Sequence, residues 1–317
     1  MSNSTYISQL NFASLQINRY VPIGLLLFGI VGNTLSCLVF LQKTLRTNPC
    51  VVYFLAASTA NLISLIDGIP SRWLNSWNIL RDLTETQSGL CKCRIFVLFV
   101  SRNIASWLLV LAAIDRYFIS SKEVHIRQRS NIKQAYISIG TVCLGSIVLW
   151  SEAIYCFDAN LIGTPVKCYA KSDVCRIIND LAQALVTTII PSSIMMIFGL
   201  YTIKNIHQSH RIGPVSTTNT LGGRRKADHH LTRMLFGQVI LLTIFNMPQA
   251  IQKFYLTATF YQVKSANQRA LENLIFSIVL LLTYVANCLP FYLYILTSHS
   301  FRTILCQCNR NILRCAN

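Results

Sequence analysis

Seven long stretches of this chain carry almost no charged residues, and this feature limits the folds open to it more than any other. Six are free of Asp, Glu, Lys and Arg: residues 20–42, 47–66, 134–151, 181–203, 234–252 and 273–301. A seventh, residues 95–114, is interrupted only by Arg102. A helix needs about 20 apolar residues to cross the hydrocarbon core of a membrane. We therefore expect an all-α membrane protein with a seven-transmembrane helix bundle.

Composition and periodicity favour the same fold class. Of the 317 residues, 53% are hydrophobic and 12% are charged, whereas a soluble domain is about 25% charged. None of the seven stretches alternates apolar and polar residues with the period of two that spanning strands require. Helices satisfy their own backbone hydrogen bonds within lipid. Composition therefore argues against a soluble helical protein, and periodicity argues against a β-barrel.

The distribution of charge predicts which way the bundle faces. If the amino end is outside, the inner segments hold 16 cations and three acids, and the outer segments hold 11 cations and eight acids. Cytoplasmic loops carry an excess of Lys and Arg. We therefore expect an extracellular tail at 1–20, a spanning domain at 21–298 and a cytoplasmic amphipathic helix and tail at 299–317. The net charge of +17 then faces anionic lipid rather than nucleic acid.

Cysteines and one sequon give expectations that depend on this orientation. Asn3 begins an Asn-Ser-Thr glycosylation sequon on the outer side. Cys306 and Cys308 in the inner tail are candidates for palmitoylation, with free thiols as the alternative. Outside, where disulfides form, our first choice is a bridge between Cys91 and Cys168. The surplus suggests a second bridge, but spacing leaves the pairing of three further outer cysteines open: Cys93, Cys156 and Cys175.

An Asp-Arg-Tyr triplet, residues 115–117, directly follows the stretch at residues 95–114, which is the third along the chain. Other motifs lie at fixed places along the chain: "GN" at 32–33, Cys91, Pro191, "FNMP" ending at Pro248 and "PFYLY" at 290–294. The ordered set resembles a rhodopsin-like (class A) G-protein-coupled receptor over nearly the whole chain. The resemblance implies a plasma-membrane receptor, not an enzyme, that passes an extracellular signal to a heterotrimeric G protein.

The resemblance also implies that Asp115, Arg116 and Tyr117, supported by Tyr294, form the activation switch. A guanidinium at the membrane edge needs an anionic partner, which Asp115 supplies while the bundle is closed. The family has a second acid at the base of helix six, and Asp228 occupies the corresponding place. We expect a contact between Arg116 and Asp228. The alternative is that Asp228 only solvates the basic loop around it.

The sequence departs from the family pattern in the polar core. Asn61 stands where the family has an aspartate, Ala105 where it has a serine, and Asn246 where it has a tryptophan. The side chains of Asn33, Asn61 and Asn287 either form a neutral amide network or make separate interhelical hydrogen bonds. A sodium ion would lose its only charged oxygen ligand here. We therefore expect no metal and no cofactor.

The outer half of the third stretch bears on the ligand. It has no acid to receive an amine, but it carries Arg102, whose charge within the membrane needs an anion. We expect Asp67 to be that partner; the alternative is a ligand carboxylate or an amidated-peptide carbonyl. Asn246 and Tyr284 are further ligand-binding candidates. The motifs "DRYFISS" and "RRKADHHLTRML" are most similar to those of invertebrate FMRFamide-like neuropeptide receptors, which implies a peptide ligand.

A seven-span transporter or channel is the alternative from another class of protein. It would require discontinuous helices and several acids along a path through the membrane. The span interiors offer mainly Asp67 and Arg102. The sequence also shows no nucleotide-binding loop, metal-ligand cluster or catalytic nucleophile. These features favour the receptor.

Sodium should leave agonist affinity unchanged, because the core position of Asn61 offers no carboxylate to the ion. The measurement is agonist binding with and without sodium chloride at constant ionic strength. A clear sodium-dependent shift in affinity would contradict the expectation.

Overall fold

The computed structural model describes residues 3–43, 45–77, 86–162, 166–211, 219–298 and 301–306, with backbone alone for residues 3–4, 209–211 and 219–230. Within these ranges, seven helices are long and apolar enough to cross a membrane. The elements in chain order are α1 (Asn3–Phe40), α2 (Pro49–Trp77), α4 (Ser88–Ser120), α5 (Val124–Arg127), α6 (Ile132–Trp150), α7 (Glu152–Cys156), β1 (Phe157–Asp158), β2 (Tyr169–Ala170), α8 (Asp173–Ala182), η1 (Gln183–Ile189), α9 (Ile190–Arg211), α10 (Asn219–Ala258), α11 (Ala266–Cys288) and α12 (Pro290–Thr297).

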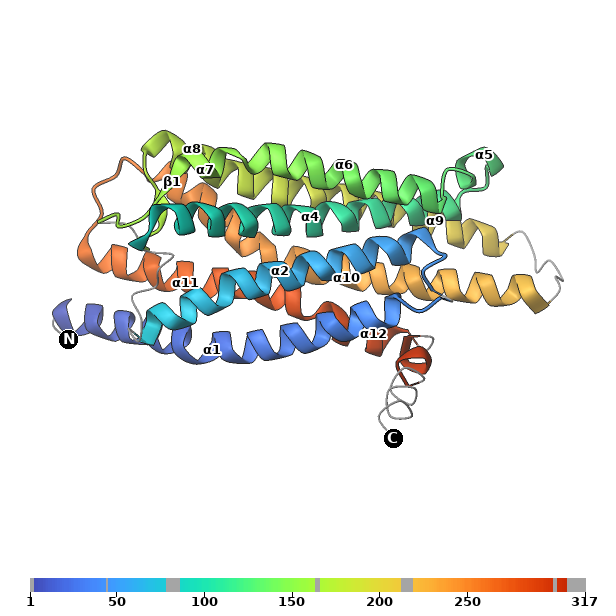
Figure 1. The fold of residues 1–317 in the computed structure, drawn as a ribbon, viewed down its shortest axis with the longest axis horizontal. Coiled ribbons are helices and arrows are strands. Elements are labelled where there is room, and N and C mark those ends of the chain that lie inside the picture. Colours follow the sequence, from blue (N-terminus) through green and yellow to red (C-terminus); the bar gives the residue numbers. More distant parts are fainter. Residues whose placement is uncertain are drawn as a thin grey trace.

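The long helices run side by side along one axis, with β1 at one end of the bundle and α5 at the other (Figure 1). We call the end near β1 the disulfide end. We call the other end, where residues 115–117 lie in the last turns of α4, the triplet end. Helix α4 packs against α2, α6 and α9, so it contacts neighbouring helices on several sides. The expected seven-helix membrane fold is confirmed.

Helix α1 is longer than the sequence predicted. Its 38 residues span about 57 Å, well beyond the ~30 Å hydrocarbon core. Near its start, Asn18 Nδ2 donates to Ser277 Oγ of α11 (3.1 Å), and Arg19 Nε donates to the carbonyl oxygen of Ser76 in α2 (3.0 Å). The segment expected to be a tail is therefore helical from Asn3 and packed on two helices. Its extracellular location stays a prediction.

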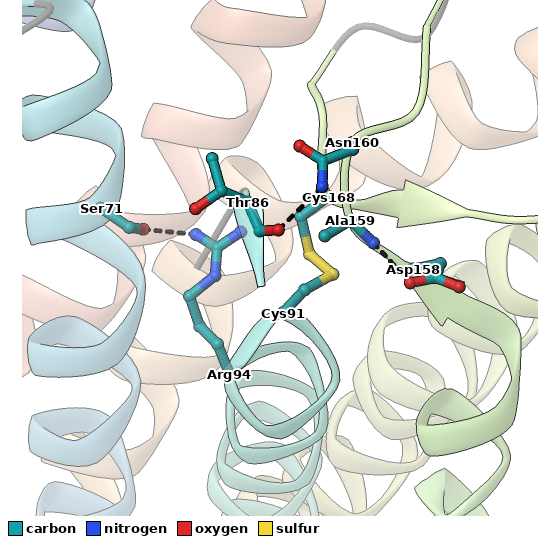
Figure 2. The surroundings of a disulfide bond; sticks show 8 residues. All are labelled: Ser71, Thr86, Cys91, Arg94, Asp158, Ala159, Asn160 and Cys168. Atoms are coloured by element: carbon teal, nitrogen blue, oxygen red, sulfur yellow. Dashed lines mark hydrogen bonds between the residues drawn. A yellow bond between two sulfur atoms is a disulfide. The ribbon is translucent and has the colours of Figure 1, made fainter. Parts of the chain in front are cut away.

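Two disulfides fasten the loop between α6 and α8. The predicted bridge between Cys91 and Cys168 is present and ties this loop to the start of α4 (Figure 2). The pairing that the sequence left open is Cys156 with Cys175. Cys93 lies exposed and outside any disulfide. The two bridges hold the loop across the disulfide end of the bundle.

Local hydrogen bonds shape the same loop beside the antiparallel pair β1 and β2. Asn160 adopts a φ of 60°, which Asn tolerates better than most residues. Its Nδ2 donates to the carbonyl oxygen of Thr86 (2.8 Å, Figure 2). Hydrogen bonds from the Ser88 side chain and the Ala159 backbone N–H lower the pKa of the Asp158 carboxyl. These contacts fix the chain where it enters α4.

The fifth span changes helix type part-way along. Segment η1 is a π-helix between α8 and α9. Pro191, just after η1, has no N–H to donate to the carbonyl oxygen four residues earlier, so the regular α-helical ladder cannot continue through it. One backbone carbonyl oxygen of η1, that of Val186, accepts a hydrogen bond from Trp107 Nε1 of α4 (3.1 Å).

Aromatic side chains close the triplet end. Phe40 packs against the rings of Phe54, Tyr294 and Phe301, with ring centroids 5.6–5.8 Å apart. Residues 301–306 are helical, and Phe301 anchors this turn in the core. The rest of the predicted amphipathic helix and tail lies outside the described residues.

Gly29 allows α1 to approach its neighbours closely. A Cβ there would lie 2.6 Å from Leu65 Cδ1 and 2.7 Å from Cys288 Sγ. Gly29→Ala should therefore lower the melting temperature in detergent, because overpacking costs about 1–3 kcal/mol and outweighs the ~1 kcal/mol gain in helix propensity.

Gly24→Ala is the matched control in the same helix, since nothing lies within 4 Å of its Cβ position. It should be neutral or stabilising. Equal melting temperatures for the two variants would show that the close approach at Gly29 is wrong.

Candidate functional site

A buried arginine marks the triplet end. Arg116 Nη2 lies 2.7 Å from Asp115 Oδ2 and donates to Asn48 Oδ1 at 2.9 Å. Ser130 Oγ donates to the other Asp115 oxygen at 2.5 Å. Arg116 is 2% exposed and Asp115 5% exposed. Adjacent residues of a helix do not normally face each other, so the start of α2 and the segment before α6 help to hold this pair together.

Sequence reasoning missed Asn48 and Ser130. Asn48 also caps α2, because its Oδ1 accepts from the backbone N–H of Cys50 (3.0 Å), and Pro49 follows at the first helical position. An Asn-Pro pair before an apolar run predicts such a cap. Its hydrogen bond with Arg116 could not be predicted in the same way, because it depends on the start of α2 lying beside the end of α4.

Tyr117 does not turn toward Arg116. Its ring packs on α9, 5.4 Å from the Phe198 ring and 6.1 Å from the Tyr201 ring. The side chain of Asp228 lies outside the described residues, so its contact with Arg116 stays a prediction.

Tyr294 connects α12 to α10. The residue is 1% exposed, and its hydroxyl donates to Gln238 Oε1 at 2.5 Å. Gln238 is itself buried, and the sequence did not single it out. A buried hydrogen bond therefore joins α12 directly to α10.

The polar core is only partly connected. Asn33 Nδ2 donates to the backbone carbonyl oxygens of Gly29 (2.9 Å) and Asn287 (3.0 Å). In the described core, Asn33, Asn61 and Asn287 share no amide-to-amide hydrogen bond, so a direct network of these side chains does not form. Asn61, Asn287 and Asn246 instead line a cavity of about 30 Å³, and no carboxylate is among the described residues around it.

A larger cavity, about 390 Å³, lies at the disulfide end. Helices α1, α2, α4, α8, α10 and α11 contribute to its wall, together with Cys168 and Tyr169 of the disulfide-bonded loop. Among the described residues that line it, five are cationic and one is acidic: Arg72, Arg94, Arg102, Arg176, Lys253 and Asp180. Its wall is therefore strongly basic.

The expected ion pair between Arg102 and Asp67 is wrong. In the described part of the chain, neither residue forms an ion pair. Arg102 Nε donates weakly to Ser64 Oγ (3.4 Å), and its guanidinium carbon lies 4.5 Å from the centre of the Tyr284 ring. A cation–π contact and a hydroxyl oxygen are therefore the direct partners of the guanidinium among the described residues. Of the four ligand-binding candidates, Arg102 and Tyr284 line the large cavity, whereas Asp67 and Asn246 do not.

An ion pair that the sequence did not predict crosses the cavity wall. Lys253 Nζ of α10 contacts Asp180 Oδ1 of α8 at 2.5 Å, and Arg176 Nε lies 3.9 Å from Asp180 Oδ2. Asp180 is 3% exposed and Lys253 8% exposed. A lysine directly after a charge-free stretch was the available signal, but nothing in the sequence joins it to an acid 73 residues away.

Comparison with known proteins identifies the family. The profile of the 7 transmembrane receptor (rhodopsin family) matches residues 32–294. The chain belongs to the rhodopsin family of seven-transmembrane receptors. Membership makes it a signalling receptor of the G-protein-coupled class rather than an enzyme, and it disfavours the transporter or channel.

Individual relatives of this rhodopsin-family receptor are distant. Probable G-protein coupled receptor 34 of Mus musculus is 24% identical over 285 residues, which cover 89% of this chain and 73% of that protein. The protein of the same name from Pan troglodytes is 24% identical over 283 residues, 88% and 72% of the two chains. Muscarinic acetylcholine receptor M5 of Rattus norvegicus is 30% identical over 132 residues, only 42% of this chain and 24% of that receptor.

Lys253→Met should lower the melting temperature markedly, because leaving a buried carboxylate without its main partner costs about 3–5 kcal/mol. The double variant Lys253→Met with Asp180→Asn should recover most of the loss, since it removes both buried charges. Thermal unfolding of the purified receptor measures both effects.

Lys171→Met is the control, because Lys171 is exposed and lies outside this ion pair; it should unfold like the wild type. If the double variant were as unstable as Lys253→Met, the loss would not come from an unpaired Asp180.

Proposed function

We propose that this receptor binds an extracellular peptide in the 390 Å³ cavity and, in response, activates a heterotrimeric G protein at the triplet end. The observation that carries the proposal is the buried Arg116, held by Asp115 and Asn48 at the opposite end of α4 from the cavity. The amino end is outside and the receptor resides in the plasma membrane.

The proposed mechanism is a shift between two populations. In the closed bundle, Arg116 is held by its carboxylate and amide partners. In the open bundle, α10 moves away from α4 and Arg116 faces the G protein. A ligand favours the open bundle only by the difference in its affinity for the two states. The hydrogen bond from Tyr294 to Gln238 couples α12 to this movement.

Two observations support a peptide as the ligand. The cavity volume falls within the usual range for ligand sites, about 300–1,000 Å³, and its wall is drawn from six helices and a loop, which offers a long molecule many contacts. The motif likeness to FMRFamide-like receptors points the same way. None of the three relatives named above is a peptide receptor by name, so this part of the proposal rests on the motifs and the cavity.

An amine is the second candidate ligand, because one relative is named for acetylcholine. An amine needs a carboxylate in the cavity. Asp180 is the acid among the described lining residues, and it is already engaged by Lys253 and Arg176. We therefore favour the peptide.

Several features outside the cavity belong to the same proposal. Asp228 supplies a second partner to Arg116 in the closed bundle. Asn3 carries a glycan, and Cys306, which is exposed, is palmitoylated together with Cys308. The segment from Phe301 onward lies on the inner leaflet as an amphipathic helix.

Replacing Arg116 should abolish signalling, and loosening it should raise basal signalling. Arg116→Ala removes the residue that meets the G protein. Asn48→Ala removes a hydrogen bond to a charged group that exists only in the closed bundle, and such bonds contribute about 1.5–3 kcal/mol, so basal guanine-nucleotide exchange should rise about tenfold. The measurement is exchange on purified heterotrimeric G proteins, with the receptor in lipid nanodiscs.

Asn131→Ala is a close match to Asn48→Ala. Asn131 caps α6 through Gln134 as Asn48 caps α2, and it has no hydrogen bond to Arg116. Its basal exchange should equal that of wild type. Identical rates for the Asn48 and Asn131 variants would count against the switch.

A further inference from the structure

We propose that the ligand of this receptor presents an anionic group, a carboxylate or a phosphate, to Arg102 deep in the large cavity, with Arg94 as a second anion contact nearer the disulfide end. The inference rests on the proposed function, because it concerns the same cavity, and it adds the charge of the ligand.

The cavity has more positive charge than its own acids neutralise. Asp180 is the one carboxylate among the described lining residues, and its two oxygens lie against Lys253 and Arg176. One carboxylate carries a single negative charge, so Asp180 cannot neutralise the five cations among these lining residues. A low-dielectric cavity with unbalanced charge of one sign attracts ligands of the other sign.

Arg102 is the deepest of these cations. It lines both the large cavity and the small polar cavity beneath it. Among the described residues, its Nη2 is buried without a hydrogen-bond partner, and its side chain contacts Ser64 through a long hydrogen bond and the face of the Tyr284 ring. Neither contact carries a negative charge. A guanidinium within the membrane is stabilised by an anion, and a carboxylate or phosphate matches its planar array of donors.

Arg94 repeats the pattern two turns nearer the disulfide end. Its Nη1 donates to Ser71 Oγ at 2.5 Å, and its Nε is buried without a hydrogen-bond partner in the part of the chain that the structure describes. Figure 2 shows the side chain reaching from α4 toward Ser71, beside the disulfide of Cys91. This position lies on the way from the loop to Arg102, so Arg94 meets an incoming anion first.

Asp67 does not satisfy either arginine. Its carboxylate is close enough to interact electrostatically with both guanidinium groups, but it forms no ion pair with either. Within the described ranges, its Oδ2 is buried without a hydrogen-bond partner. Asp67 is also absent from the described wall of the cavity. A ligand anion can therefore reach Arg102 without displacing an existing ion pair.

The test uses small molecules that carry only the charged group, because the proposal concerns the binding of that group and not of a whole ligand. Thermal unfolding of the receptor in nanodiscs is followed with inorganic phosphate, butyl phosphate, butyrate and butylammonium at equal ionic strength. The anions should raise the melting temperature in a saturable way and butylammonium should not. A larger effect of butyl phosphate than of inorganic phosphate indicates a headgroup on a larger ligand; equal effects indicate the free ion.

Two variants test which arginine binds the anion, and a third controls for the loss of one positive charge outside the cavity. Arg102→Gln should weaken the apparent affinity for the anions about tenfold or more, the loss expected for a charge-assisted hydrogen bond. Arg94→Gln, which is nearer the cavity mouth, should weaken it less. Lys171→Gln removes an outer cation that lies on the Tyr155 ring and not in the cavity, and should change nothing.

Stabilisation by butylammonium, equal anion affinity in wild type and Arg102→Gln, or no anion effect at all would each overturn the proposal. If Arg102→Gln does not fold, Arg94→Gln decides in its place, and unchanged affinity there overturns the proposal. This readout needs no G protein. Anion binding together with equal basal nucleotide exchange in the Asn48→Ala and Asn131→Ala variants would therefore count against the proposed signalling and leave the anion site standing.

Discussion

The interaction on which this structure depends is the buried contact between Arg116 and Asp115. Removing both charges from water costs several kcal/mol for each ion, and their attraction repays this only where further hydrogen bonds complete the site. Here Asn48 accepts a hydrogen bond from the guanidinium, and Ser130 donates one to the carboxylate. Because the two supporting groups come from different segments, the pair is favourable only while those segments stay in place. Small movements of these segments would therefore weaken the hydrogen bonds that hold Arg116 against Asp115.

Helix α4 joins this pair to the cavity. Arg102 and Arg116 lie on the same helix, about 21 Å apart along its axis. Around α4, the ion pair of Lys253 with Asp180 holds α10 at the disulfide end, and the hydrogen bond from Tyr294 to Gln238 holds α10 near the triplet end. Two polar contacts, one at each end, thus hold α10, the helix that moves in the proposed mechanism. The first of them lies in the wall of the proposed ligand cavity.

The sequence predicted the features that depend on local physics or on ordered motifs. The seven spans follow from length and hydropathy alone. The location of the triplet near one end of α4 and the disulfide of Cys91 at the other end follow from where these residues lie along the span. The contacts among side chains were harder to predict. Asn48, Ser130 and the pairing of Lys253 with Asp180 were missed, and Arg102 was paired with Asp67 in error. Each of these depends on how one helix is rotated against another, which no single stretch of sequence encodes. The helical start of α1 was also missed, because polar residues there pack on α2 and α11.

The most direct measurement is the structure of this receptor bound to a nucleotide-free heterotrimeric G protein, determined by electron cryo-microscopy. Removal of the nucleotide holds the complex in its open state without a known agonist. We predict that Arg116 Nη2 has moved beyond the ion-pair limit of about 4 Å from Asp115 and contacts the G protein. A bound G protein with the Arg116–Asp115 contact still at 2.7 Å would contradict it.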